Sequence, residues 1–193
     1  MRIKEAQKRF KELDRQNRRV FTSGDMRKFY PQDSDKAIAD GISRLMASGD
    51  LERPAKGIYV YANTIHPRTH LVYEVARALR RGFHTYLSME SALSEYGAIS
   101  QVPSGHITFM TTGRRGEFKT PYGNIEFTHT KRDPADFVAD LRDNNRPLPI
   151  ASCERAYVDL KRVGRNLHLV QMDEVEEEIA RAKTMEMTDA EFC

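Results

Sequence analysis

The chain has 193 residues, and its 39% hydrophobic content is enough for a packed core in one domain or two small ones. With 31% charged residues and no apolar run of about 18 residues, the composition excludes a membrane-spanning helix. The formal net charge is +3, and the charged first residues predict no secretory signal. We therefore expect a cytoplasmic protein in which Cys153 and Cys193 are free thiols.

The chain is predicted to begin with a charged amphipathic helix over residues 4–17, where apolar residues recur at spacings of four and three. Residues 20–23 follow as a short extended segment rich in β-branched and aromatic side chains. Ser23 is the expected N-cap of a short helix over residues 24–29, which Tyr30-Pro31 ends.

A third helix is better marked than the first two. Ser34 is its predicted N-cap, and an apolar stripe runs from there to the Ser48-Gly49 stop. Residues 51–61 then alternate as a β-hairpin with a basic turn at 54–57. This order of elements is typical of a winged helix-turn-helix, with residues 34–48 as the recognition helix and the hairpin as the wing.

The rest of the chain predicts a second, mixed domain. We expect strands over 83–87 and 106–111 and a further strand pair near 118–128, forming an antiparallel sheet. Ser88 is the expected N-cap of the helix that follows the first of these strands. Other helices are predicted over residues 71–82, 134–142, 154–162 and 173–183. The predicted fold class is therefore α+β, with a winged helix-turn-helix over residues 1–62 and an α+β domain over residues 63–193.

The charge is distributed unevenly between these parts. Residues 1–62 hold 14 Lys and Arg against 9 Asp and Glu, residues 63–132 hold 9 against 5, and residues 133–193 hold 8 against 14. The basic first two thirds favour a polyanionic partner such as nucleic acid, although solvated helix faces give the same pattern. The expected DNA-binding residues are Arg18, Arg19, Ser34, Lys36, Ser43, Arg44, Arg53 and Lys56. In the second domain, the expected contacts to nucleic acid or a partner are Arg80, Arg81, Arg114, Arg115 and Lys119.

Patterns for catalysis are weak. Glu117-Phe118-Lys119 matches the Glu-x-Lys motif of metal-dependent nucleases. Such a site usually needs a further aspartate, and none lies between Asp50 and Asp133. His66 and His70 lack a cluster of further metal ligands. No phosphate-binding loop or activated nucleophile is evident. We expect neither an enzyme nor a metal or other cofactor.

Several motifs in order resemble one family. They are Phe21-Thr22-Ser23-Gly24-Asp25, the run from Ile42 to Arg53, Lys56-Gly57-Ile58-Tyr59, the run from Tyr86 to Gly97, Gln101-Val102-Pro103, and the run from Pro149 to Leu160. Together they are similar to the AbiEi antitoxins of AbiE-type abortive-infection (phage-defence) systems, which are type IV toxin–antitoxin operons.

The resemblance implies a transcriptional repressor and antitoxin. Its winged helix would bind inverted repeats in its own promoter, on double-stranded DNA. The protein would be a monomer in solution or a dimer on the DNA. Its C-terminal domain would counteract a nucleotidyltransferase-like toxin without a stable complex with it. The alternative left open by the sequence is a module that binds a protein or RNA partner directly through the C-terminal domain, without promoter-specific repression.

Overall fold

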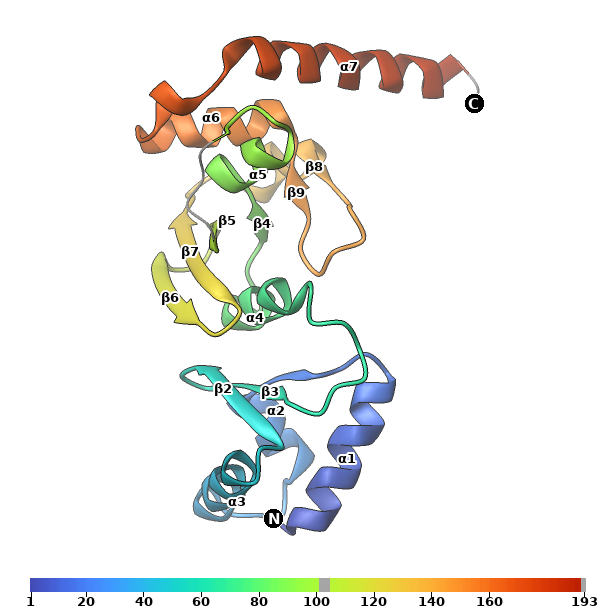
Figure 1. The fold of residues 1–193 in the computed structure, drawn as a ribbon, viewed down its shortest axis with the longest axis vertical. Helices are drawn as coiled ribbons and strands as arrows, with labels where there is room; N and C mark the ends of the chain where they lie inside the picture. Colours follow the sequence, from blue (N-terminus) through green and yellow to red (C-terminus); the bar gives the residue numbers. More distant parts are fainter. Residues whose placement is uncertain (101–104, 192–193) are drawn as a thin grey trace. The chain divides into compact units, whose positions relative to one another are not determined.

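The structure, a computed structural model, describes residues 1–100 and 105–191, with side chains described as far as residue 184. The motif Gln101-Val102-Pro103 and Cys193 lie outside the described residues. The chain is a mixed α+β protein that divides into two compact units (Figure 1). Unit 1 contains Met1–Arg81 and Lys119–Tyr122, and unit 2 contains Gly82–Phe118 and Gly123–Cys193.

Unit 1 consists of helices around a small sheet. Its elements are α1 (Ile3–Arg15), β1 (Val20–Thr22), α2 (Ser23–Phe29), α3 (Asp35–Ala47), β2 (Leu51–Ala55), β3 (Ile58–Tyr61) and α4 (Leu71–Leu79). The three strands form an antiparallel sheet in the order β1-β3-β2. The helices and the hairpin predicted from the sequence between residues 4 and 61 are confirmed.

In the core of unit 1, the apolar faces predicted for the helices and the first strand pack against one another. Phe10 of α1 lies against Phe21 of β1, with their ring centroids 5.1 Å apart, and Ile42 and Leu45 of α3 are buried with them. One cap differs from the prediction. Thr22, not Ser23, is the N-cap of α2, because its hydroxyl accepts from the backbone N–H of Asp25 while the Asp25 carboxylate accepts from the N–H of Thr22.

The compact units divide after Arg81, whereas the predicted domain boundary follows residue 62. The intervening segment is tied to unit 1 by polar contacts with α1. The buried Asp14 carboxylate accepts hydrogen bonds from the Thr64 hydroxyl at 2.6 Å and from the backbone N–H of Ile65 at 2.9 Å. His66 Nε2 also lies 2.6 Å from the carbonyl oxygen of Asp14. The segment from 63 to 81 therefore folds with unit 1.

Unit 2 is built on a six-stranded sheet. Its strands are β4 (Thr85–Leu87), β5 (His106–Thr111), β6 (Gly116–Thr120, of which the last two residues belong to unit 1), β7 (Gly123–His129), β8 (Leu141–Arg142) and β9 (Ile150–Ala151). Their order in the sheet is β6-β7-β5-β4-β9-β8. Its helices are α5 (Met89–Glu95), α6 (Cys153–Val163) and α7 (Met172–Glu191), with short 3-10 turns η1 (Pro134–Asp136), η2 (Val138–Asp140) and η3 (Leu167–Leu169). In Figure 1, α7 runs beside α6, and its Val175 is buried.

The sheet of unit 2 is mixed, so the predicted antiparallel arrangement is wrong in part. β5 pairs with β7 in parallel register, with Phe109 opposite Phe127. The reason is the strand order, since the chain leaves β5, forms β6 on the far side, and returns in β7 between the two. Two reversals of direction make β7 parallel to β5. β4 and β5 pair antiparallel as expected.

The predicted helix over residues 134–142 is also wrong. Asp133 caps the η1 turn by accepting from the N–H of Ala135, and the chain continues through η2 into strand β8. Leu141 of β8 pairs with Ala151 of β9. Strand pairing therefore takes the end of this segment away from a helical path, which local periodicity does not reveal.

Candidate functional site

The outer face of α3 carries polar and basic side chains. Ile38, Gly41, Ile42 and Leu45 are buried on its inner face. Lys36, Ser43 and Arg44 are exposed on the opposite face, as predicted. Ser34 caps the helix, because its hydroxyl accepts from the N–H of Ala37 at 3.2 Å. Lys36 and Ser43 are seven residues apart, about two helical turns, so they lie on one line along the helix, and Arg44 lies about 100° further around it.

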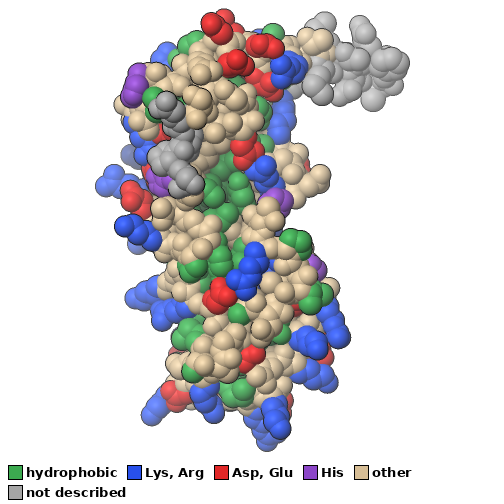
Figure 2. Space-filling view, in the orientation of Figure 1, with side chains coloured by type: hydrophobic (Ala, Val, Ile, Leu, Met, Phe, Trp, Pro, Cys, Tyr) green, Lys and Arg blue, Asp and Glu red, His purple; other side chains and the backbone are tan. Residues whose placement is uncertain are grey.

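Strand β2 and the turn that follows it present a second set of exposed cations. Lys56 and Arg53 are both exposed. Gly57 has φ of +77°, a left-handed backbone conformation that closes the turn. A residue with a side chain would be strained in this conformation. The Gly57 carbonyl oxygen accepts from the backbone N–H of Ser23 at 2.9 Å, which anchors the turn to the start of α2. Figure 2 shows Lys and Arg side chains gathered around α3 and α1, and Asp and Glu side chains gathered over α7.

The acidic residues near α3 are partly neutralised within unit 1. Asp35 forms an ion pair with Arg27 at 2.9 Å, and Asp33 lies 3.0 Å from the amino nitrogen of Met1. Asp40 is exposed, and its carbonyl oxygen accepts from Nε of Arg44 at 3.3 Å. The carboxylates of Asp33 and Asp35 therefore oppose an approaching polyanion less than the sequence implies.

The two adjacent arginines before β1 have different environments. Arg18 is exposed, with its guanidinium 6.0 Å from the ring centroid of Phe29. Arg19 is only 4% exposed and forms a buried ion pair with Glu74 of α4, with Nη2 2.5 Å from Oε1. Its Nη1 also donates to the carbonyl oxygen of Pro67 at 2.8 Å. The prediction of Arg19 as a DNA contact is therefore wrong, because its charge is buried against a carboxylate.

Three of the cations predicted for the C-terminal domain, Arg80, Arg81 and Lys119, belong to unit 1. Arg81 pairs with Asp25 of α2 at 2.7 Å. Burial acts to raise the pKa of Asp25, but hydrogen bonds from Arg81 and Thr22 outweigh it and lower that pKa. Arg80 is half-buried, and this burial lowers its pKa. Arg80 and Arg81 are thus engaged at the end of α4, and of the predicted set only Arg114 and Arg115 lie in unit 2.

Unit 2 contains a cavity of about 1250 Å³. It is lined by residues 112–117 at the β5–β6 turn, residues 126–129 of β7, Phe83, Val163 and Arg165. Arg114 and Arg115 are exposed, and Phe83 is 54% exposed. The structure therefore brings the two predicted arginines to a concave surface that also carries an aromatic ring.

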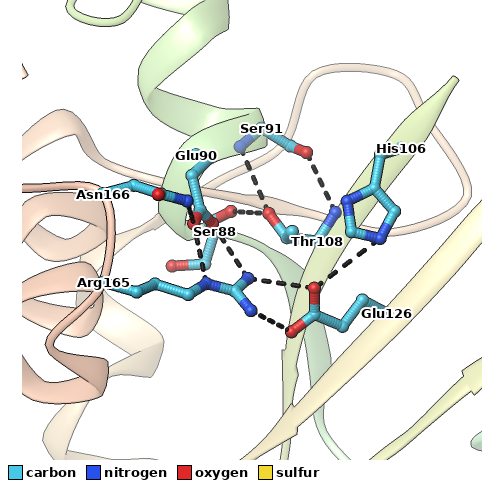
Figure 3. Close-up of polar contacts among 8 residues, drawn as sticks. All are labelled: Ser88, Glu90, Ser91, His106, Thr108, Glu126, Arg165 and Asn166. Carbon is cyan, nitrogen blue, oxygen red and sulfur yellow. Dashed lines mark hydrogen bonds and ion pairs between the residues drawn. The ribbon is translucent and has the colours of Figure 1, made fainter. Parts of the chain in front are cut away.

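Beside this cavity lies a polar network that the sequence did not predict (Figure 3). Arg165, just after α6, contacts two carboxylates, with Nε 2.7 Å from Glu90 Oε1 and Nη1 2.6 Å from Glu126 Oε1. Asn166 Nδ2 donates to Glu90 at 2.9 Å, and His106 Nε2 lies 3.7 Å from Glu126. The partners of Arg165 are 75 and 39 residues away in the sequence, so no local motif marks them.

The network shifts the pKa values of Glu90 and Arg165. Burial acts to raise the pKa of Glu90, but hydrogen bonds from Arg165 and Asn166 lower it below its ordinary value. Burial acts to lower the pKa of Arg165, but its bonds to Glu126 and Glu90 raise it instead. The charge of Arg165 is therefore compensated inside the fold, and the group fixes the end of α6 against α5 and β7.

Ser88 occupies the N-cap position of α5, and a second buried carboxylate explains why its side chain does not cap the helix. The Ser88 hydroxyl and the Tyr86 hydroxyl each donate to Oδ2 of Asp159 at 3.0 Å. The predicted N-cap position is therefore confirmed, but the Ser88 side chain makes no capping hydrogen bond at the start of α5. Burial raises the pKa of Asp159. These contacts hold β4 to α6 and have a structural role.

The structure adds no support for the catalytic and metal-binding motifs considered from the sequence. Glu117 is exposed on β6, and within residues 1–100 and 105–191 no three His, Cys, Asp or Glu side chains gather in the way that a metal ion requires. Cys153 is buried beside a second cavity of about 590 Å³, and burial raises the pKa of its thiol to about 11. It is therefore not a thiolate near neutral pH. None of the helices described is long and apolar enough to cross a membrane.

Fold and geometry together define a mixed α+β protein with two compact units, one with an exposed basic face and one with an arginine-lined cavity. No family model and no curated protein matches the chain. Among solved structures, the RV2827C protein from Mycobacterium tuberculosis is similar, with a TM-score of 0.52 at 15% identity. The match covers 88% of this chain and 69% of that chain, and at this identity it supports the fold alone.

Proposed function

We propose that this chain is a DNA-binding autorepressor and antitoxin of the AbiEi type. In this proposal residues 1–62 act as a winged helix-turn-helix, with α3 in the major groove and the β2–β3 turn against the phosphate backbone. The observation that carries it is the exposed face of α3, where Lys36, Ser43 and Arg44 lie opposite the buried apolar stripe. A helix presented in this way fits the major groove, which is about 12 Å wide.

The division of labour on this surface follows from side-chain chemistry. Arg44 and Ser43 have donors that suit base edges, whereas Lys56, Arg53 and Arg18 suit phosphate oxygens. Each phosphate contact releases counterions, so binding by these cations falls steeply as salt rises, by about one unit of log–log slope per contact. Two copies on an inverted repeat would place two α3 helices in successive turns of the major groove.

The test is binding of the purified chain to a duplex carrying its own upstream region. Fluorescence anisotropy at several salt concentrations, with a permuted duplex beside it, separates specific from general binding. We expect Arg44→Ala to reduce the preference for the upstream duplex by about tenfold, which corresponds to one bidentate base contact. Arg77→Ala is the matched control, because Arg77 is exposed on α4 of the same unit but outside this face. Equal affinity for both duplexes would refute the repressor proposal.

The antitoxin part of the proposal rests on the resemblance of residues 86–97 and 149–160 to the family's C-terminal domain. In this reading unit 2 counteracts a nucleotidyltransferase-like toxin without a stable complex. Co-expression with the product of the neighbouring gene tests it through growth rescue. We expect the Arg114→Ala/Arg115→Ala variant to lose rescue while it retains promoter repression. Loss of both activities together, in a folded variant, would show that the two units do not divide these roles.

A second candidate function is a module that binds a protein or RNA partner directly through unit 2. The observation that favours it is the cavity with Arg114 and Arg115 at its surface. Co-purification of the neighbouring gene product with the tagged chain, lost in the Arg114→Ala/Arg115→Ala variant, would support this candidate over promoter-specific repression. Absence of a co-purifying partner, together with specific promoter binding, would favour the first.

A further inference from the structure

The cavity of unit 2 has walls whose positions are held by hydrogen bonds. The imidazole Nδ1 of His129 lies 2.7 Å from the carbonyl oxygen of Gly113. A carbonyl oxygen only accepts, so Nδ1 carries the proton and Nε2 is left as an acceptor in the neutral ring. The N–H of Gly113 in turn donates to the Thr111 hydroxyl at 3.1 Å. The start of the β5–β6 turn is thereby fixed to the end of β7, and both Gly113 and His129 line the cavity.

Another part of the lining is fixed by the network of Figure 3. Arg165 lines the cavity, but its guanidinium is bound by Glu126 and Glu90 on neighbouring elements. Its charge is therefore already matched within the fold. Arg114 and Arg115 also line the cavity, and both side chains are exposed on the turn.

Two features of the lining select a ligand class. Adjacent guanidinium groups bind phosphate oxygens through paired, charge-assisted hydrogen bonds. Phe83, which lines the same cavity, leaves 54% of its surface in solvent, and the imidazole of His129 is exposed beside the turn. Exposed rings next to arginines are the usual platform for stacking a nucleobase. Glu117 adds an exposed carboxylate that accepts from a ribose hydroxyl or a base amine.

We propose that this cavity binds a nucleoside phosphate, with its phosphates on Arg114 and Arg115 and its base stacked on Phe83 beside His129. A concave site of about 1250 Å³ suits one such unit better than it suits a protein surface. The nucleoside phosphate is either a free nucleotide or a terminal or flipped-out unit of a single-stranded RNA. The inference goes beyond promoter binding and does not depend on it.

The experiment uses the full chain and measures binding of ATP, GTP, CTP and UTP by isothermal titration calorimetry. A six-nucleotide single-stranded RNA and inorganic triphosphate are titrated in parallel. Arg114→Ala and Arg115→Ala are each expected to weaken nucleotide binding about tenfold, as for one charge-assisted hydrogen bond each. Phe83→Ala is expected to weaken it by about tenfold through loss of base stacking. All three side chains are exposed, so the variants should remain folded, which circular dichroism checks.

The matched control is Lys161→Ala/Lys183→Ala, which removes two exposed positive charges of unit 2 outside the cavity and should leave binding unchanged. Equal affinity for mononucleotides and RNA assigns the site to free nucleotides, and much tighter RNA binding assigns it to a strand; both support the proposal. Binding of inorganic triphosphate as tight as that of ATP, with no effect of Phe83→Ala, would overturn it. Absence of binding by any nucleotide or RNA would also overturn it. If the chain fails to bind its upstream duplex but binds nucleotides, only the repressor proposal falls.

Discussion

The buried pair of Arg19 and Glu74 makes the sharpest prediction about unit 1. Glu74→Leu removes the carboxylate and leaves a guanidinium that is 96% buried, since Arg19 is only 4% exposed. Removal of one partner from a buried ion pair costs about 3–5 kcal/mol of the free energy of unfolding, because the other charge stays buried without compensation. For a unit of this size, such a loss lowers Tm by at least about 12 °C.

The assay is urea unfolding of the full chain at low temperature, followed by circular dichroism. Arg18→Met is the matched control, because the adjacent Arg18 is exposed and its loss should change stability by less than about 0.5 kcal/mol. The double variant Arg19→Met/Glu74→Leu replaces the pair with apolar side chains of similar size and should recover most of the loss.

The same variants separate a structural role of Arg19 from a role in DNA binding. Where the protein is folded, Arg19→Met should leave the salt slope of duplex binding unchanged, whereas Arg18→Ala should lower it by about one. The reasoning is refuted if Glu74→Leu costs no more than Arg18→Met. It is also refuted if Arg19→Met lowers the salt slope in a folded protein.

Three further predictions concern other contacts. Lys56→Ala should weaken binding to every duplex equally and lower the salt slope by about one, which anisotropy across salt concentrations checks. Thr22→Ala removes the capping box of α2 and should cost about 1 kcal/mol in urea unfolding, whereas Ser23→Ala should cost less because Ser23 is not the cap. The pKa of Glu90 is lowered in the folded state. The bonds from Arg165 to the ionised Glu90 carboxylate therefore stabilise the folded protein fully above pH 4.5, the ordinary pKa of the group, and this stabilisation is lost as the pH falls through the folded pKa. The stability difference between the wild type and Glu90→Gln should therefore be largest near neutral pH and shrink below 4.5; a difference that is constant with pH would contradict the ion pair.

Local elements of this protein follow closely from neighbouring residues. The Ser34 cap and the spacing of Ile38, Ile42 and Leu45 predict α3 and also predict which side chains it leaves exposed. The turn at Lys56-Gly57 predicts the hairpin of β2 and β3. These signals act over a few residues, so a single sequence is enough to read them.

Other features depend on partners that the sequence places far away. Arg18 and Arg19 are identical in chemistry and adjacent, yet the fold leaves Arg18 exposed and buries Arg19 against Glu74 and the carbonyl oxygen of Pro67. Ser88 has the local pattern of a cap, but the buried Asp159 takes its hydroxyl. An isolated pattern shows what a side chain is able to do, and the tertiary structure decides which of its possible partners it meets.

The sequence by itself therefore determined the α+β class, most helices, the hairpin and the exposed cations of α3 and its neighbouring turn. Only the tertiary structure decided the parallel pairing of β5 with β7, the cavity at Arg114 and Arg115, and the network around Arg165. The physical reason is the distance along the sequence between the residues that interact. Helical periodicity and caps are encoded within one or two turns, whereas strand order and buried ion pairs join residues that are distant in sequence.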